Sequence, residues 1–144
     1  MAIYIDTSAL AKRYLAERGS DAFDAFLIGQ SDDCLISPLV ATELESVVQR
    51  LLRQRLIDKA YAEQVRQDFA NDLRGALWSM RPFPTASLAR AAELLRIVVA
   101  PLATLDALHL ATAVEFDCSA IATGDRQLAK AAAEHGSDVH PFLV

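Results

Sequence analysis

Short apolar runs alternate along this sequence with longer segments of helical periodicity, and this alternation limits the folds available to the chain. The runs are typical of buried strands, and strands are predicted at residues 2–6, 34–36, 78–82, 119–123 and 138–142. One or two predicted helices separate each strand from the next, and strands joined in this way generally lie parallel in one sheet. The pattern therefore predicts an α/β domain with a short, mainly parallel central sheet flanked by helices.

The predicted helices are bounded by residues that commonly start or end a helix. Ser37 followed by Pro38 is a favourable start, because Ser can cap the first turn and Pro fits the first helical position. Ser20, Asp58 and Thr104 are further predicted caps. The helices are expected at about residues 8–18, 21–29, 38–53, 58–74, 85–98, 104–116 and 125–134.

The composition fits one globular domain, expected to span residues 1–144. Apolar residues make up 53% of the chain and charged residues 23%, an ordinary globular balance. We expect no membrane span, because no stretch of about 20 apolar residues occurs. No signal peptide is recognisable, so a cytoplasmic location is expected. The net charge of −5 disfavours a general nucleic-acid coat, although a cluster of metal-binding acids would bias that count.

Cysteine and histidine show no metal-binding pattern. Cys34 and Cys118 are far apart in apolar surroundings, and we interpret them as buried free thiols. The three histidines lack the spacing of a zinc site. Any metal site predicted from this sequence must therefore use oxygen ligands.

Two aspartates follow predicted strands directly. Asp6 ends the first strand, and Asp125 follows the strand 119–123 after one glycine. In open parallel sheets, functional groups gather at the carboxyl ends of the strands. These two carboxylates are therefore expected at the same edge of the sheet.

Two further acids stand on predicted helices. Glu43 lies at the edge of the apolar stripe of the helix 38–53, where a carboxylate needs a partner, and that helix offers no cation within one turn. Asp106 lies in the first turn of the helix 104–116, with His109 three residues on and on the same side. Both acids are candidates for the same site as the strand-end aspartates.

Each of these four acids has an ordinary structural explanation when taken alone. Asp6 and Asp125 can cap helices, Asp106 can favour the helix dipole, and Glu43 can extend from the core edge to water. Their joint placement at strand ends and helix starts favours a shared charged site. Converging carboxylates repel one another unless a cation relieves the repulsion, and oxygen ligands without His or Cys favour Mg²⁺ or Mn²⁺. Such an ion can activate water and stabilise the charge on a phosphodiester.

Hydroxyl side chains stand next to the acids. Thr7, Ser8, Thr104 and Thr123 could orient the carboxylates or hold a metal-bound water. Helix capping remains an equally good explanation for Thr104.

Four segments, taken in order, resemble one family. They are I-Y-I-D-T-S-A-L, P-L-V-A-T-E-L, T-L-D-A-L-H-L-A-T-A and I-A-T-G-D-R-Q-L. Together they resemble the PIN-domain ribonucleases, and more narrowly the VapC toxins of bacterial toxin–antitoxin pairs. No single motif is specific, but the ordered set spans nearly the whole chain. The resemblance implies a PIN-like three-layer α/β/α fold.

The resemblance also implies a function. By position, Asp6, Glu43, Asp106 and Asp125 match the family's catalytic and metal-binding acids. The family cleaves structured RNA (transfer, ribosomal or messenger RNA) with Mg²⁺ or Mn²⁺, usually as a homodimer, and is neutralised by a VapB-like antitoxin. One departure is that Gly124 precedes Asp125 where the family often has a small polar residue.

Several arginines are candidates for contacts with RNA phosphates. Arg50 and Arg53 belong to a locally basic stretch, and Arg13 and Arg126 lie within two helical turns of the strand-end aspartates. The alternative is that these arginines simply solvate helix faces.

Two other protein classes with acids at strand ends do not fit this sequence. A haloacid-dehalogenase phosphatase needs a second aspartate where Ser8 stands, and a receiver domain needs paired acids and a lysine at a later strand end. The remaining alternative is a catalytically inactive PIN-like module that binds RNA or protein. The stripe of Tyr61, Val65, Phe69 and Leu73 can be either core or a partner surface.

Overall fold

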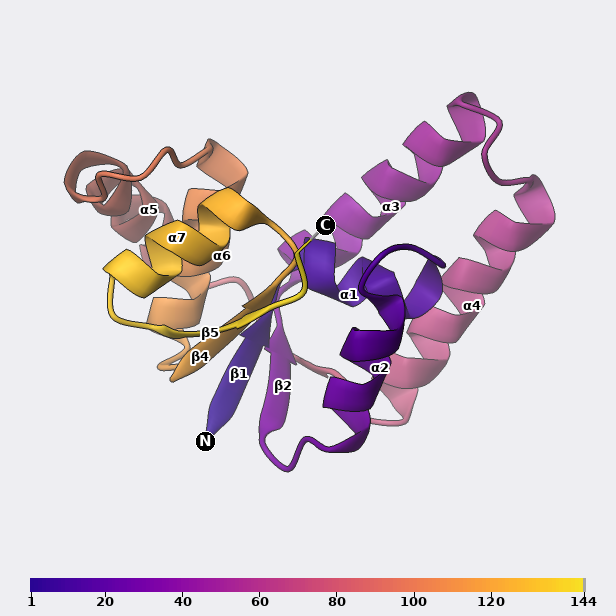
Figure 1. Ribbon diagram of the computed structural model, residues 1–144, viewed down its shortest axis with the longest axis horizontal. Helices are drawn as coiled ribbons and strands as arrows, with labels where there is room; N and C mark the ends of the chain where they lie inside the picture. The colour runs from indigo at the N-terminus through magenta and orange to yellow at the C-terminus, as the bar shows by residue number, and fades with distance from the viewer. Residues whose placement is uncertain (144) are drawn as a thin grey trace.

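The computed structural model describes residues 1–143, and its secondary structure follows the predicted alternation (Figure 1). The strands are β1 (Ala2–Ile5), β2 (Asp33–Ile36), β3 (Ser79–Met80), β4 (Ala120–Thr123) and β5 (Asp138–Pro141). The helices are α1 (Thr7–Tyr14), α2 (Ser20–Ile28), α3 (Pro38–Arg53), α4 (Lys59–Arg74), α5 (Ala86–Ile97), α6 (Thr104–Glu115) and α7 (Arg126–Glu134).

The strands form one sheet in the order β3-β2-β1-β4-β5. All four strand pairings within the described part of the chain are parallel. β1 lies at the centre, with Tyr4 paired to Leu35 of β2 on one side and to Ile121 of β4 on the other. The carboxyl ends of β1 and β4 therefore lie side by side.

Helices cover both faces of the sheet, and the alternation of side chains along β1 shows how. Ile3 and Ile5 belong to a core packed against α1, α2, α3 and α4, whereas Tyr4 belongs to a second core packed against α5, α6 and α7. Figure 1 shows these two helical layers on opposite sides of the strands. The predicted three-layer α/β/α fold is confirmed.

The apolar stripe of α4 packs inside the molecule. Val65 and Phe69 are buried and Leu73 is partly buried against the same core, whereas Tyr61 remains 40% exposed. Most of this stripe is thus used for packing within the chain.

The end of α1 differs from the prediction. The helix was expected to reach residue 18, but it ends at Tyr14, and Leu15 is extended with φ −116° and ψ 127°. The buried Lys12 holds the next turn of chain by donating to the carbonyl oxygen of Arg18 at 2.8 Å, and Ser20 Oγ donates to the carbonyl oxygen of Leu15 at 3.0 Å. These contacts stabilise a turn where the sequence pattern predicted helix.

Helix caps follow the prediction where an aspartate is available. Asp58 and Asp125 accept hydrogen bonds from the backbone N–H groups of Tyr61 and Leu128. Thr104 was predicted to cap α6, but it is the first helical residue and Ala103 occupies the cap position. Ser37 occupies the cap position of α3, yet makes no side-chain cap bond. The local sequence therefore predicted where these helices start, but it did not predict which hydroxyl side chains cap them.

Within residues 1–143, no helix is both long and apolar enough to cross a membrane.

Candidate functional site

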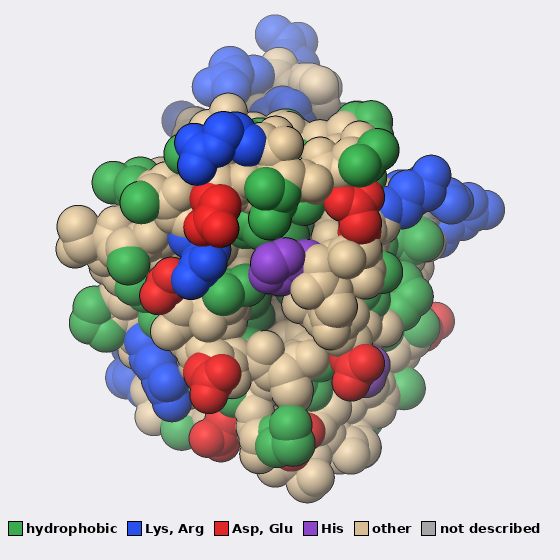
Figure 2. Space-filling view, turned by 90° about the vertical axis from the view of Figure 1, so that its left-hand side faces the viewer, with side chains coloured by type: hydrophobic (Ala, Val, Ile, Leu, Met, Phe, Trp, Pro, Cys, Tyr) green, Lys and Arg blue, Asp and Glu red, His purple; other side chains and the backbone are tan. Residues whose placement is uncertain are grey.

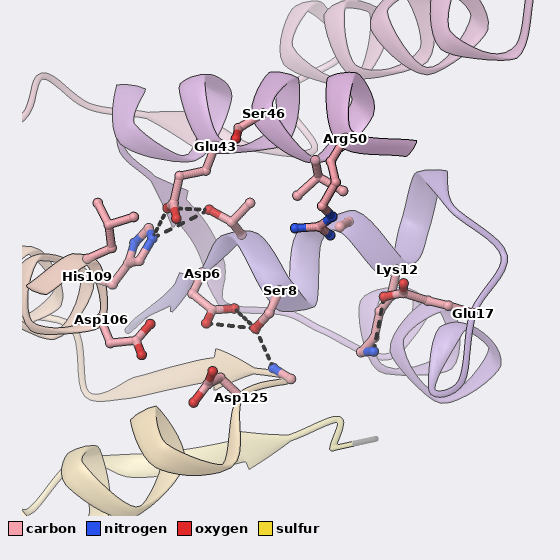
Figure 3. Close-up of a pocket in the computed structure, with 15 residues that line it drawn as sticks. Asp6, Ser8, Lys12, Glu17, Glu43, Ser46, Arg50, Asp106, His109 and Asp125 are labelled. Atoms are coloured by element: carbon pink, nitrogen blue, oxygen red, sulfur yellow. Dashed lines mark hydrogen bonds and ion pairs between the residues drawn. The ribbon is translucent and has the colours of Figure 1, made fainter. Parts of the chain in front are cut away.

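A pocket of about 450 Å³ opens at the carboxyl ends of β1 and β4. All four predicted acids line it: Asp6 after β1, Glu43 on α3, Asp106 on α6 and Asp125 after β4. Figure 3 shows the carboxylates of the three aspartates directed toward a common space, with Glu43 on the α3 side. The fold thus brings together acids that span 119 positions of the sequence, from residue 6 to residue 125.

Asp6 is the most deeply buried of these acids, with only 2% of its surface exposed. It is the N-cap of α1, and its Oδ1 accepts from the backbone N–H of Ala9 at 2.9 Å. Burial raises the pKa of this carboxyl, while the hydrogen bonds that it accepts act in the opposite direction. Asp6 therefore caps α1, as expected for an aspartate at a helix start, and its carboxylate still lines the pocket.

Two hydroxyl groups hold Asp6 in place. Ser8 Oγ lies 2.8 Å from both carboxylate oxygens, and Thr123 Oγ1 donates to Oδ2 at 2.6 Å. The same hydroxyls accept from the turn after β4: Ser8 from the N–H of Gly124 at 2.8 Å, and Thr123 from the N–H of Asp125 at 3.0 Å. The carboxylate orientation and the turn that carries Asp125 are therefore fixed by one network.

Asp106 carries the electrostatic signature of a crowded acidic site. Burial, followed by the negative charges of Asp125 and Asp6, raises the pKa of Asp106 to about 6. Asp125 is itself the N-cap of α7, because its Oδ1 accepts from the N–H of Leu128 at 2.9 Å. The charges of these acids therefore oppose one another when all are ionised.

Glu43 has the partner that its own helix could not supply. Its Oε1 accepts from Thr7 Oγ1 at 2.8 Å and from Nε2 of His109, a side chain of α6 that is only 2% exposed. Burial raises the pKa of Glu43, but the hydrogen bond from His109 and the bond from Thr7 outweigh this effect, so the pKa lies below its usual value. Glu43 is thus held as a carboxylate at the pocket wall.

The chemistry of this donor set fits a hard divalent cation. The pocket presents carboxylate oxygens, and the negative charges of Asp125 and Asp6 add to burial in raising the pKa of Asp106. Among residues 1–143, no group of three Asp, Glu, His or Cys side chains lies close enough together to hold a metal ion as the side chains stand.

A sequence profile of the PIN domain matches residues 3–134, which include all four acids. The chain belongs to the PIN domain family. The family predicted from the four sequence segments is thereby confirmed. No curated protein sequence matches this PIN domain.

Solved structures share the fold of this PIN domain at low sequence identity. FitAcB from Neisseria gonorrhoeae is 18% identical with a TM-score of 0.75, covering 97% of each chain. VapBC2 from Rickettsia felis, bound to a DNA fragment from their promoter, is 14% identical with a TM-score of 0.69 and covers 98% of each chain. VapC20 from Mycobacterium tuberculosis, a Sarcin-Ricin loop cleaving toxin, is 15% identical with a TM-score of 0.68, covering 94% of this chain and 95% of VapC20.

The four candidate phosphate-binding arginines of this PIN domain occupy different places. Arg50 lines the acidic pocket, one turn beyond Ser46 on α3. Arg53 lines a separate hollow at the α3–α4 turn, and Arg126 is exposed at the start of α7. Arg13 faces α4 and binds Asp72 through two hydrogen bonds, from Nε at 2.7 Å and Nη2 at 3.1 Å. Only Arg50 among them lies on the pocket itself.

The four candidate hydroxyl side chains also differ in whether they contact the acids of the pocket. Thr7, Ser8 and Thr123 each hydrogen-bond to an acid of the pocket, as described above. Thr104 is exposed and lies outside the residues that line the pocket.

Two side chains near the acids, His109 and Tyr4, were not among the predicted site residues. His109 was noted only for sharing a helix side with Asp106, and Tyr4 was interpreted as strand core. Lys12 lines the pocket although it is only 3% exposed. The spacing of Asp106 and His109 was the one sequence signal that could have identified the histidine.

The outer face formed largely by α5, α6 and α7 has no single charge character. Figure 2 shows acidic and basic side chains interspersed there with exposed apolar ones. The exposed apolar side chains of α5 and the residues after it include Leu88, Leu95, Ile97 and Val99. This face does not present a continuous basic surface.

Proposed function

We propose that this PIN domain is a metal-dependent endoribonuclease toxin that cleaves phosphodiester bonds of structured cellular RNA. The observation that carries the proposal is the convergence of Asp6, Glu43, Asp106 and Asp125 on one pocket. Packing alone gives no reason to place four acids from four separate segments together, since the charges of Asp125 and Asp6 add to burial in raising the pKa of Asp106. The similar fold of VapC20, a Sarcin-Ricin loop cleaving toxin, supports the same substrate class.

The four carboxylates would hold Mg²⁺ or Mn²⁺. When bound, such an ion supplies the positive charge that activates a water molecule and stabilises the negative charge of a phosphodiester under attack. Ser8 and Thr123 keep the carboxylate of Asp6 directed into the pocket, and Thr7 and His109 do the same for Glu43. The protein therefore prepares its acids before any ligand arrives, which limits the reorganisation needed on binding.

RNA would reach the acids along α3. Arg50 lines the same pocket as Glu43, and an exposed guanidinium can bind phosphate through two hydrogen bonds. A phosphate of the strand beside the cleaved bond is the group that we expect Arg50 to contact.

An antitoxin and a second copy of the chain are the proposed protein partners. The similar folds in FitAcB and VapBC2 support a VapB-like antitoxin. Exposed apolar side chains such as Leu88 and Val99, at 60% and 90% exposure, support a contact surface on the α5 side. We propose that the chain forms a homodimer in the cytoplasm.

Cleavage of labelled cellular RNA by purified, antitoxin-free protein tests the proposed activity. Asp6→Asn keeps a capping side chain but removes the charge, so we expect cleavage to fall by at least about 100-fold, the upper end of the loss when a residue that only supports a metal ligand is changed. Asp58→Asn is the matched control, because Asp58 caps α4 through the same kind of bond but lies outside the acidic pocket.

Parallel reactions contain Mg²⁺, Mn²⁺ or EDTA. Cleavage that needs metal, survives in Asp58→Asn and disappears in Asp6→Asn would support the enzyme. A folded wild-type protein that cuts no RNA with either ion would favour the binding-module alternative. Equal cutting by Asp6→Asn would show that the four-acid assignment is wrong.

A further inference from the structure

A buried chain of hydrogen bonds runs from the start of α3 to the carboxylate of Glu43. Ser37 Oγ lies 3.2 Å from the hydroxyl of Tyr4, and that hydroxyl lies 2.7 Å from Nδ1 of His109. On the other side of the imidazole ring, Nε2 contacts Oε1 of Glu43. Ser37, Tyr4 and His109 are each at most 2% exposed. This series of hydrogen bonds therefore lies in the core and ends at the pocket.

The donor and acceptor capacities of the groups give these bonds one direction when the imidazole is neutral. An ionised carboxylate has no proton to donate, so in the contact with Glu43 the proton lies on Nε2 of His109. A neutral imidazole with its proton on Nε2 has a bare Nδ1, which needs a donor. Tyr4 is that donor, because burial raises its pKa and keeps the hydroxyl protonated. Ser37 can then donate to the tyrosine oxygen.

Packing alone does not explain these polar side chains. Tyr4 lies among Leu110, Ile121 and Leu128 in the second core, where Phe would fill the space without a hydrogen-bond partner. An apolar residue at position 109 would likewise avoid burying two ring nitrogens. The hydroxyl and Nδ1 of the imidazole bond to each other, and the hydrogen bonds lead to His109 and Glu43, which both line the pocket.

We propose that Tyr4 and His109 are positioning residues for Glu43, acting as a relay that fixes the imidazole with Nε2–H on the carboxylate. The proposal rests on the proposed function, because it assigns the relay to a carboxylate that would hold the metal. Both hydrogen bonds to Glu43 fall on Oε1, from His109 and from Thr7, and no described residue donates to Oε2. Oε2 is thus the oxygen that the relay leaves for a ligand. Neither Tyr4 nor His109 need touch the RNA.

Tyr4→Phe removes one hydroxyl from the relay and leaves the ring that fills the core. We expect Mn²⁺ binding to the protein alone, measured by calorimetry, to weaken by about 10-fold, the low end for residues that orient metal ligands. Tyr14→Phe is the matched control, because the Tyr14 hydroxyl also joins two side chains, Asp72 and Trp78, but lies outside the acidic pocket. That variant should keep the wild-type affinity.

The tautomer of His109 gives a readout that a general loss of stability would not move. Nitrogen-15 NMR at pH 8, without metal, should show the His109 proton on Nε2 in the wild type and a shift toward mixed tautomers in Tyr4→Phe. A wild-type ring with its proton on Nδ1 would overturn the relay.

Substitution of His109 tests the donor itself. His109→Gln keeps an N–H group that can reach Glu43 and should bind Mn²⁺ more tightly than His109→Leu, which has no donor. Equal Mn²⁺ affinities for the two variants, or no loss of affinity in Tyr4→Phe, would overturn the relay. If Glu43→Gln still weakens Mn²⁺ binding in that case, the proposed enzyme function stands. Absence of Mn²⁺ binding by the wild type would instead overturn the proposed function and, with it, the relay.

Discussion

Asp6 serves two purposes with one carboxylate. One oxygen caps α1 through the N–H of Ala9, and the other accepts from Thr123. Ser8 bonds to both oxygens. A buried carboxylate at the start of a helix is stabilised by the helix dipole and by these donors, so it can remain at the pocket floor despite the charges around it. At this scale, a residue that caps a helix also lines the acidic pocket.

Asp106 is expected to destabilise the metal-free protein at neutral pH. Its pKa rises to about 6 in the folded protein, so its charge is unfavourable above that pH and the penalty disappears as the pH falls toward the ordinary value near 4. Asp106→Asn should therefore raise the free energy of unfolding by about 1 kcal/mol at pH 7.5, a value discounted for partial exposure, and by much less at pH 4.5.

Urea unfolding in EDTA at the two pH values measures this difference. Asp33→Asn, at the exposed start of β2, controls for the general loss of a negative charge. An equal gain in both variants, or a gain that does not depend on pH, would contradict the prediction.

At the scale of elements, the turn between β4 and α7 packs tightly against α1. A Cβ atom at Gly124 would lie 3.0 Å from Cε of Lys12 and 3.3 Å from the carbonyl oxygens of Ser8 and Phe142. Two of these three neighbours are backbone atoms, which cannot move without shifting their elements. This close approach explains why glycine stands before Asp125.

Gly124→Ala should destabilise the protein by about 1 to 3 kcal/mol, the usual cost of overpacking. Gly29→Ala is the control, because a Cβ there would meet no atom closer than 3.6 Å and the backbone is helical. That substitution should change stability by less than about 1 kcal/mol. Thermal unfolding of both variants tests this difference in stability. Equal melting temperatures would mean that α1 and the turn shift to accommodate the added methyl group without cost.

Elements and caps with local signals were predictable, whereas long-range partners were not. The strand positions and the aspartate caps followed from runs of apolar residues and short-range bonds. The partner of Glu43 is 66 residues away in His109, and the partner of Arg13 is 59 residues away in Asp72. Such pairs depend on which helices the sheet brings together, and no spacing in the sequence encodes that. The meeting of Asp6 and Asp125 was predictable because strand ends share an edge, whereas Glu43 and Asp106 reach the pocket from the helices α3 and α6.

At the scale of the whole molecule, the acidic pocket should couple metal binding to stability. An ion that binds only the folded state stabilises it by about 2.7 kcal/mol when its free concentration is 100 times Kd. We expect Mn²⁺ to raise the melting temperature of the wild type by several degrees, and to leave Asp6→Asn nearly unchanged.

Differential scanning calorimetry with and without Mn²⁺ measures the shift. Asp58→Asn, with its cap outside the pocket, should respond as the wild type does. A rise of the same size in Asp6→Asn would mean that the ion binds elsewhere on the protein.

The central place of β1 has a consequence for synthesis on the ribosome. β1 is made first, yet its neighbour β4 and the hydroxyl of Thr123 that holds Asp6 come 117 residues later. At about 5 to 20 residues per second, Asp125 is translated roughly 6 to 24 seconds after Asp6. The nascent chain therefore emerges without an assembled pocket, and under the proposed function it could cleave no RNA before Asp125 had been translated.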